Sequence, residues 1–256
     1  MLTVISPAKT LDLDPVATPP TAPPFPEETA RLVAAARRQG LGGLGRLMGL
    51  SDKLARLNRD RIRDWDDAPE KPAALAFAGD TYVGLDAATL DVDALRWAEG
   101  HLRILSGLYG LLRPMDGIRP HRMEMGTRLA TRRGRDLYAF WGDRVALALR
   151  AQAEAVGARH LLNCASVEYV RAADRPALGL PVVTPTFLED RPGGPKQVSF
   201  AAKRARGALA RFVQEHRLED PDDLRAFAAG GYAWQADRST PDAPVFLRAA
   251  EAAAAA

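Results

Sequence analysis

The sequence has only one cysteine, Cys164, and four histidines among its 256 residues. A single cysteine excludes an intramolecular disulfide, and neither residue type follows metal-binding spacings such as C-x-x-C or H-x-x-x-H. Direct iron binding is a weak hypothesis, because only short acidic clusters such as "DWDD" (64–67) remain as candidate ligands. We expect no bound metal and no cofactor, and we interpret Cys164 as a small buried residue.

Long apolar stretches are also missing. No run of about 18 uncharged apolar residues occurs, and the N-terminus lacks the positively charged lead-in of a secretory signal. We therefore expect a cytoplasmic protein with no membrane partner. An apolar content of 47% in 256 residues is enough for one continuous core. The expectation is a single compact domain over 1–251, followed by a disordered alanine tail at 252–256.

Lysine is scarce, since only five of the 35 basic residues are lysine. Three of these, Lys9, Lys53 and Lys203, lie in the segments discussed below. The net charge is only +3, yet three windows are strongly basic: +4 over 46–63, +5 over 119–135 and +4 over 203–211. Such asymmetry is typical of a surface that binds a polyanion, although a solvated arginine-rich surface gives the same pattern.

Short apolar runs alternate with segments of helical periodicity, which predicts an α/β fold with a mixed sheet and flanking helices. Strands are expected at 2–6, 73–79, 102–107, 160–166, 180–189, 196–202 and 244–250. Helices are expected at about 27–39, 91–101, 136–156, 203–216 and 220–227, with the one at 136–156 the longest. Segment 107–129 contains too much glycine, proline and charge for regular structure, which predicts a long functional loop.

The segment "RLMGLSDKLARL" (46–57) places a glycine turn between two apolar stripes at helical spacing. It fits a helix-hairpin-helix element over about 41–64, in which unpaired backbone N–H groups of the turn and the second helix bind phosphate. A glycine with positive φ, a serine cap and flanking basic side chains complete the pattern. A plain packing corner is the equal alternative, because a serine replaces the usual second glycine and Asp52 adds negative charge. The candidate nucleic-acid-binding residues here are Gly49, Ser51, Lys53, Arg56, Arg59 and Arg61.

Polar residues directly follow several predicted strands. "ISPAKT" places Ser6, Lys9 and Thr10 after the first strand, and "GDTYVGL" places Asp80 after another. Because ligands gather at the carboxyl ends of strands in open α/β sheets, these residues are candidates for a polar cleft. The alternatives are ordinary turn residues and a solvent-exposed lysine. The loop after the strand at 102–107 adds further cleft candidates: Tyr109, Arg113, Arg122 and Glu124.

A third basic group, Lys203, Arg204 and Arg206 in "KRARG", is expected at or near a helix start. Positive charge there opposes the helix dipole, which is easier to understand if an anion binds nearby. The penalty is small, so tolerance of surface charge is the alternative. These three residues join the nucleic-acid-binding candidates.

Seven segments occur in one order over about 200 residues: "ISPAKTL", "SDKLA", "GDTYVGL", "LSGLYGLLRP", "RMEMGTRL", "DLYAFWGD" and "KRARG". Together they resemble the bacterial YaaA peroxide-stress protein family. The resemblance implies a cytoplasmic protein of the hydrogen-peroxide response that limits oxidative damage to DNA and keeps unincorporated iron low. It also implies an unusual α/β fold with a positively charged cleft and a helix-hairpin-helix element that binds DNA. It assigns no catalytic role to any residue.

Two functions follow from these patterns. The first is a DNA-binding protective protein that contacts the phosphates of duplex or distorted DNA without reading its sequence. The second is an enzyme acting on a nucleotide or nucleic-acid base in the strand-end cleft, with Asp80 or Glu124 as acid or base and Lys9 as phosphate anchor. The basic windows and the resemblance favour the first function. A small-molecule or nucleotide ligand in the cleft belongs to the second.

Overall fold

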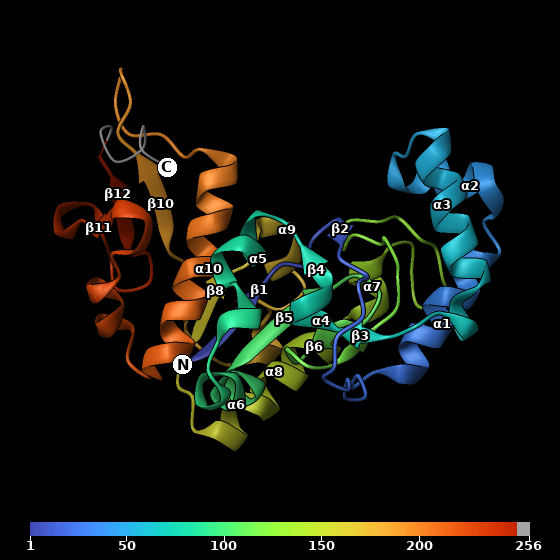
Figure 1. Cartoon of the computed structure of the whole chain (residues 1–256), viewed down its shortest axis with the longest axis horizontal. Helices are drawn as coiled ribbons and strands as arrows, with labels where there is room; N and C mark the ends of the chain where they lie inside the picture. Colours follow the sequence, from blue (N-terminus) through green and yellow to red (C-terminus); the bar gives the residue numbers. More distant parts are fainter. Residues whose placement is uncertain (250–256) are drawn as a thin grey trace.

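A five-stranded sheet with the strand order β6-β5-β1-β8-β9 forms the centre of the molecule (Figure 1). The computed structural model describes residues 1–249, so the tail predicted at 252–256 lies outside the described residues. Neighbouring strands pair in parallel, except that β6 runs antiparallel to β5 at one edge. β1, β5 and β8 are buried along their whole length, as expected of parallel strands covered on both faces. The strands span Leu2–Ile5 (β1), Leu102–Ser106 (β5), Gly110–Leu112 (β6), Leu161–Cys164 (β8) and Val182–Val183 (β9).

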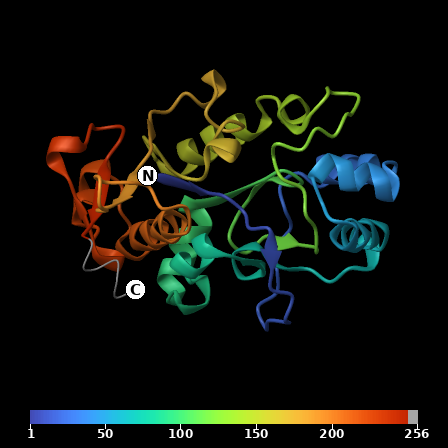
Figure 2. The ribbon, with the colours of Figure 1, turned by 90° about the horizontal axis from the view of Figure 1, so that it is seen from above.

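Helices cover both faces of this sheet, which confirms the predicted mixed α/β fold class. Figure 2 shows α10 (Ser199–His216) on one side of β1 and α8 (Arg144–Val156) on the other. α5 (Asp80–Leu85) and α6 (Val92–His101) pack beside α10. None of the described helices is long and apolar enough to cross a membrane.

The contact between α5 and α10 is made by two glycines. A Cβ on Gly84 would lie 2.0 Å from the carbonyl oxygen of Arg204, and a Cβ on Gly207 would lie 1.8 Å from that of Thr81. No side chain larger than hydrogen fits at either position, so the two helix backbones touch directly. This close approach fixes the basic second turn of α10 next to the start of α5.

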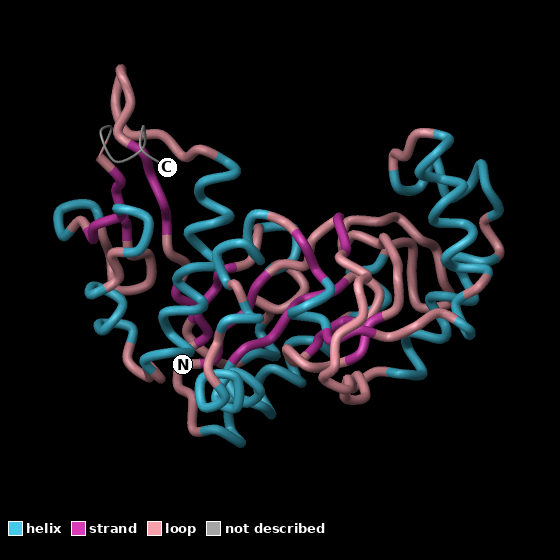
Figure 3. Tube along the Cα trace, in the orientation of Figure 1, coloured by secondary structure: helices cyan, strands magenta, loops and turns pink. Residues whose placement is uncertain are grey.

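Three helices form an arm at one end of the molecule (Figure 1): α1 (Pro26–Arg37), α2 (Gly40–Met48) and α3 (Asp52–Arg63). α1 begins with a proline followed by two glutamates, the composition that favours a helix start. Arg37 Nε donates to the carbonyl oxygen of Ile62 at 2.9 Å, which ties α1 to α3. Figure 3 shows the short loop between α2 and α3 at the end of the arm remote from α1.

A second sheet, with the strand order β10-β12-β11, lies at the opposite end of the molecule (Figure 1). Its strands are β10 (Thr186–Glu189), β11 (Tyr232–Trp234) and β12 (Val245–Arg248). The rings of Phe187 and Phe246 stack between β10 and β12. Glu189 is buried and pairs with Arg191 and Arg248, so its charge is compensated in place.

Short elements complete the described chain. They include the two-residue strand pairs β2 (Thr10–Leu11) with β4 (Phe77–Ala78), and β3 (Lys71–Pro72) with β7 (Gly117–Ile118). The short α-helices are α4 (Ala73–Ala76), α7 (Leu137–Trp141) and α9 (Val167–Val170). The 3₁₀ helices are Trp65–Asp67, Ala87–Thr89, Pro176–Leu178, Pro221–Ala226, Ala229–Gly231 and Ala236–Arg238.

Several local predictions hold within two residues, namely the helices at 27–39 and 91–101 and the strands at 102–107 and 160–166. The predicted strand at 73–79 is wrong, because "AALA" forms the helical turn α4, in keeping with the helix propensity of alanine. The loop predicted at 107–129 contains β6 and β7. The helix predicted at 220–227 is a 3₁₀ helix at Pro221–Ala226.

The single long helix predicted at 136–156 is also wrong. Gly142 has a φ of 52° and separates α7 from α8. The apolar periodicity continues across this break because Trp141 and Val145, on either side of it, both face the core. The predicted strand at 196–202 is wrong too, since α10 already begins at Ser199. At 18 residues, α10 is the longest of the described helices.

Candidate functional site

The carboxyl ends of β1, β5 and β8 open into one cleft with a volume of about 450 Å³, which we call the strand-end cleft. β1 lies between β5 and β8, which both run parallel to it, so the strand order continues from β1 towards opposite edges of the sheet. Such a reversal of strand order is where open α/β sheets bind ligands. The cleft is lined by residues 6–10, 77–81, 106, 121–124, 164, 166, 168 and 169, and by Lys203 and Arg206 of α10.

Hydrogen bonds accepted by Ser6 join the loop after β1 to the loop after β8 and to α5. The backbone N–H of Ser166 donates to Ser6 Oγ at 2.8 Å. The buried hydroxyl of Tyr82 on α5 donates to the carbonyl oxygen of Ser6 at 3.1 Å. Burial raises the pKa of Tyr82 well above its ordinary value, so this phenol stays protonated and remains a donor. Three elements are therefore tied together at the floor of the cleft.

Two cations meet one carboxylate at the cleft wall. Lys9 Nζ lies 3.2 Å and Arg122 Nη2 lies 3.3 Å from the same Oε1 atom of Glu124. Arg122 Nε is buried and has no hydrogen-bond partner among the described residues. A Cβ on Gly107 would lie 2.4 Å from the carbonyl oxygen of Met123, so only glycine lets this loop lie against the end of β5. The wall therefore presents a cluster with net positive charge.

α10 supplies the other cations of the cleft. Lys203 and Arg206 line it, whereas Arg204 does not, and none of the three has a carboxylate within ion-pair distance in residues 1–249. The three residues were expected at or near a helix start, but α10 begins four residues before Lys203, so they lie beyond its first turn. The argument from the helix dipole therefore does not apply to them. Their unpaired charge is the stronger argument for an anionic ligand.

The remaining predicted cleft residues divide into two groups. Thr10 and Asp80 line the strand-end cleft with Ser6, Lys9, Arg122 and Glu124, so the loops expected to converge do meet. Tyr109 and Arg113 lie outside it. The Tyr109 hydroxyl accepts a hydrogen bond from the Arg119 amide at 2.9 Å within an aromatic cluster. Arg113 pairs with the buried Asp116 at 2.7 Å. Both serve packing in the segment that was expected to be a loop.

The corner at Gly49 differs from the expected phosphate cradle. Gly49 does adopt a positive φ, 58°, but its N–H and that of Leu50 both donate to the carbonyl oxygen of Gly45. These two amides close the end of α2. The sequence predicts that they are unpaired and available to phosphate, and this prediction is wrong for both of them. Ser51 precedes α3, but its side chain accepts no capping hydrogen bond. The turn joins two helices, and the amides left for an anion are those of the first turn of α3.

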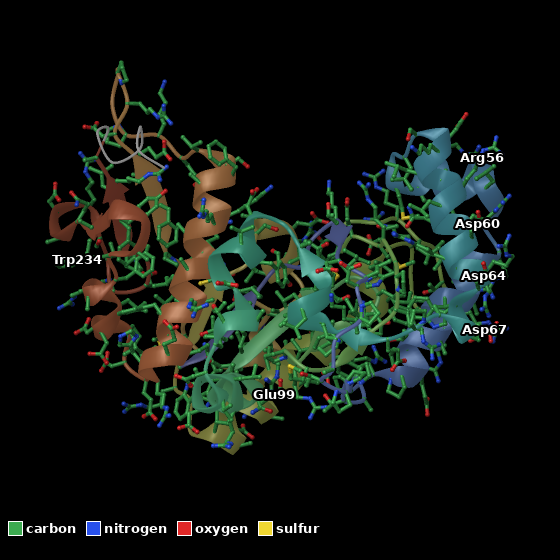
Figure 4. The ribbon with its side chains drawn as sticks, viewed as in Figure 1. Arg56, Asp60, Asp64, Asp67, Glu99 and Trp234 are labelled. Atoms are coloured by element: carbon green, nitrogen blue, oxygen red, sulfur yellow. The ribbon has the colours of Figure 1, made fainter. Side chains whose placement is uncertain are left out.

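The basic residues of α3 do not share one face. Figure 4 places Arg56 on the outer edge of the helix in line with Asp60, away from α10. Arg59 pairs with Asp60 at 2.9 Å. Lys53 is exposed and has no carboxylate partner within the described chain. Arg61 is half-buried, and its charge acts on His121 at the cleft. Among these residues, Arg61 is the one whose charge reaches a residue of the cleft, His121.

Several cleft residues were missed by sequence reasoning, namely His121, Cys164, Ser166, Glu168 and Tyr169. Ser166 directly follows the parallel strand β8, so the rule that identified Lys9 after β1 applies to it equally. His121, Glu168 and Tyr169 carry no such signal, because they enter the cleft from a long irregular segment and from the short helix α9.

Burial controls the protonation of these additional groups. Burial, with a smaller contribution from the positive charge of Arg61, lowers the pKa of His121 to about 4, although the contact of Nδ1 with the Arg119 carbonyl acts in the opposite direction. It raises the pKa of the Cys164 thiol to about 12. It also raises the pKa of Tyr169, beside Glu168 and Glu124. All three side chains are therefore neutral at physiological pH, and the charges in the cleft come from its lysines, arginines and carboxylates.

The cleft is thus a polar site with four cations, three carboxylates and several hydroxyl groups. This set suits an anionic ligand that also carries hydrogen-bond donors. In the part of the chain that the structure describes, no group of three or more histidine, cysteine, aspartate or glutamate side chains is positioned to hold a metal ion.

Residues 1–238 match the family model described as peroxide stress protein YaaA. The chain belongs to the YaaA family. Its relatives include the UPF0246 protein of Jannaschia sp. (strain CCS1), 57% identical over the whole length of both chains. A UPF0246 protein of Ruegeria pomeroyi is 57% identical over 97% of this chain and 98% of its own length. One from Cereibacter sphaeroides is 58% identical over 97% of this chain and all of its own.

Because the chain belongs to the YaaA family, the strand-end cleft is a site in a member of a peroxide stress protein family. It confirms the resemblance seen in the seven sequence segments, five of which place residues in the cleft: "ISPAKTL", "GDTYVGL", "LSGLYGLLRP", "RMEMGTRL" and "KRARG". A sixth supports the same region, because Trp141 Nε1 of "DLYAFWGD" donates a hydrogen bond to the carbonyl oxygen of Gly107 at 2.9 Å.

Proposed function

We propose that this YaaA protein binds DNA through its phosphates during peroxide stress, along the face that carries the strand-end cleft. The observation that carries the proposal is the set of unpaired cations on α10: Lys203, Arg204 and Arg206 have no carboxylate partner in the described chain, and two of them line the cleft. Most of the other arginines pair with a carboxylate within residues 1–249, so these three cations belong to the minority whose charge the protein leaves uncompensated. Such charge binds phosphate without reading bases.

The arm supplies the second half of the proposed interface. In Figure 1 the α2–α3 arm and the N-terminal half of α10 rise on opposite sides of the strand ends. Lys53 stands near the start of α3, at the end of the arm, and the amides of that first turn are available to a phosphate. A nucleic-acid strand that follows the cleft would contact α10 on one side and the arm on the other. Arg56 and Arg59 make no contribution to this arrangement.

Fluorescence anisotropy with a labelled duplex and a bubble-containing duplex tests the proposal. We expect binding at low salt that weakens steeply as salt rises, and Lys203→Glu/Arg206→Glu should reduce the slope of log K against log salt by about 2. Lys53→Glu should weaken binding to a smaller extent. Arg150→Glu on α8, which removes an exposed arginine paired with Glu154, is the matched control. Absent binding at low salt, or unchanged binding in the double variant, contradicts the proposal.

We also propose how DNA binding serves the peroxide stress response for which the family is named. Bound to DNA, the protein limits oxidative damage and helps to keep unincorporated iron low. A strain lacking the gene should regain a low mutation frequency under hydrogen peroxide when it expresses the wild-type chain. Expression of Lys203→Glu/Arg206→Glu should not restore it. Equal rescue by the wild-type and variant proteins would show that protection does not depend on DNA binding, which contradicts this part of the proposal.

A second candidate function is an enzyme acting on a nucleotide or a nucleic-acid base. The specific observation in its favour is the convergence of Lys9, Arg122 and Glu124 in a cleft that also holds Asp80. In such an enzyme Lys9 and Arg122 would anchor phosphate, and Asp80 or Glu124 would move the proton. Incubation with nucleotides and damaged oligonucleotides, followed by chromatography, should then give a product that Glu124→Gln does not form. Identical chromatograms with and without protein would rule this function out for those substrates.

A further inference from the structure

A second concave site lies on the side of α1, outside the strand-end cleft. One wall consists of Arg31, Ala34 and Ala35 of α1 with Arg38, which directly follows the helix, and the rest of the lining includes Arg132 and Arg133. We call this site the arginine groove. Its volume is about 760 Å³. Arg31 and Arg38 are seven residues apart, or about 10 Å along a helix, so the groove is long enough for more than one phosphoryl group.

The arginine groove has more guanidinium groups than carboxylates. Glu28 is approached by three arginines, with Arg133 Nη2 at 3.2 Å, Arg31 Nη1 at 3.7 Å and Arg144 Nε at 3.9 Å. Arg31 also pairs with Glu27. Arg38 and Arg132 have no carboxylate partner anywhere in residues 1–249, and both are exposed. The charge of the groove is therefore only partly neutralised by the protein itself.

The wall that carries Arg132 and Arg133 is ordered before any ligand arrives. Thr131 and Gly134 exchange two backbone hydrogen bonds, which close a tight turn with both arginines at its tip. A Cβ on Gly134 would lie 2.4 Å from Ala139 Cβ, so the turn is seated directly against α7. The guanidinium of Arg133 also lies over the Phe140 ring, 5.0 Å from its centre. Such preorganisation reduces the entropy lost on binding.

We propose that the arginine groove is a phosphate-binding site, separate from the strand-end cleft and independent of the function proposed for it. Guanidinium groups bind phosphoryl oxygens in a bidentate manner, and they retain their charge at any physiological pH. The unpaired Arg38 and Arg132 come from the two segments that line the groove, and the small side chains of Ala34 and Ala35 leave room for the ligand. The ligand is a phosphoryl group of either the nucleic-acid backbone or a free phosphorylated compound.

Nuclear magnetic resonance of the ¹⁵N-labelled full chain, titrated with pyrophosphate, tests the proposal at the groove itself. The amide resonances of Ala34 and Gly134 should shift in a saturable manner. Arg38→Gln/Arg132→Gln should weaken the affinity at the groove by at least about tenfold, because two charge-assisted contacts are lost. Both side chains are exposed and lack ion pairs within the described chain, so the variant should fold normally. Arg150→Gln is the matched control and should behave as wild type.

A parallel titration with a short DNA duplex identifies the source of the phosphate. If DNA shifts the same resonances and the double variant binds it more weakly, the groove holds nucleic-acid backbone. If only pyrophosphate does so, the groove takes a free phosphorylated compound. Lys203→Glu/Arg206→Glu should keep the pyrophosphate shifts at the groove, which separates this site from the cleft. Missing shifts at Ala34 and Gly134, or equal affinity in wild type and Arg38→Gln/Arg132→Gln, would overturn the proposal.

Discussion

Lys9 Nζ lies 3.2 Å from Glu124 Oε1, and this ion pair joins the loop after β1 to the basic window 119–135. The Lys9 side chain is 67% exposed, so solvent screens the pair strongly. Exposed ion pairs typically stabilise a fold by about 0–1 kcal/mol. The pair therefore has little to do with stability, and its position at the mouth of the cleft suits ligand binding.

Lys9→Met should separate these two roles. The free energy of unfolding in urea should change by less than about 1 kcal/mol, because the pair is exposed. The affinity for DNA should fall, since Glu124 would lose one of its two neutralising cations and repel phosphate. Arg96→Gln, which removes an exposed arginine paired with Asp93 on α6, controls for the loss of one positive charge. A large loss of stability with unchanged binding would show that Lys9 is structural.

Gly207→Ala should destabilise the fold strongly. A methyl group at this position meets the Thr81 carbonyl at 1.8 Å, so α5 and α10 must separate. Overpacking of this kind typically costs about 1–3 kcal/mol or more, which exceeds the gain of about 1 kcal/mol in helix propensity. Gly42→Ala in α2 is the matched control, because its new Cβ would approach only the flexible end of Arg46, at 3.4 Å. Urea denaturation should show opposite signs for the two variants, and a stabilising Gly207→Ala would refute the close contact.

The stability of the protein should decline in mild acid because of His121. Burial lowers its pKa from about 6.5 to about 4, so the unfolded chain binds a proton that the folded chain excludes between these values. The contribution of neutral His121 is therefore present above pH 6.5 and is lost as the pH falls towards 4, by up to about 3 kcal/mol. His101, whose pKa is also lowered by burial, contributes in the same direction.

His121→Phe should flatten this pH dependence, because it keeps the aromatic packing against Trp65 and Phe77 but removes the titrating group. Denaturation curves collected from about pH 4 to 7.5 compare the two proteins across the interval in which His121 changes protonation. Wild type should lose more stability than the variant across that range. Parallel losses in both proteins would mean that His121 is not the group responsible.

Cys164 should be unreactive in the folded protein. Its side chain is 2% exposed and burial raises its pKa to about 12, so almost no thiolate exists at neutral pH. A thiol-specific chromogenic reagent should modify the native chain slowly and the urea-unfolded chain at once. Cys164→Ser should leave DNA binding unchanged. Rapid modification of the native protein would point instead to a redox role for this residue.

The expectation that polar residues directly after strands share a ligand site identified part of the strand-end cleft from the sequence. Lys9 follows β1 of the central sheet, whereas Asp80 follows β4, which reaches the cleft by pairing antiparallel with β2 outside that sheet. The same expectation placed Tyr109 and Arg113 there, which was wrong: β6 runs back antiparallel to β5 and carries Arg113 away from that edge, and Tyr109, in the turn between the two strands, packs its ring against Trp65 and His121. His121 and Tyr169 gave no local signal, since neither directly follows a strand.

The sequence by itself determined the fold class, the family and the basic character of its segments, because apolar periodicity, motif order and charge are properties of the chain read locally. Tertiary structure decided which of those charges remain unpaired and where they meet. Arg59 is neutralised by its neighbour Asp60, whereas Lys203 and Arg206 are held beside the cleft by the glycine contact between α5 and α10. Pairing and proximity depend on distances across the folded chain, and residues far apart in sequence set those distances.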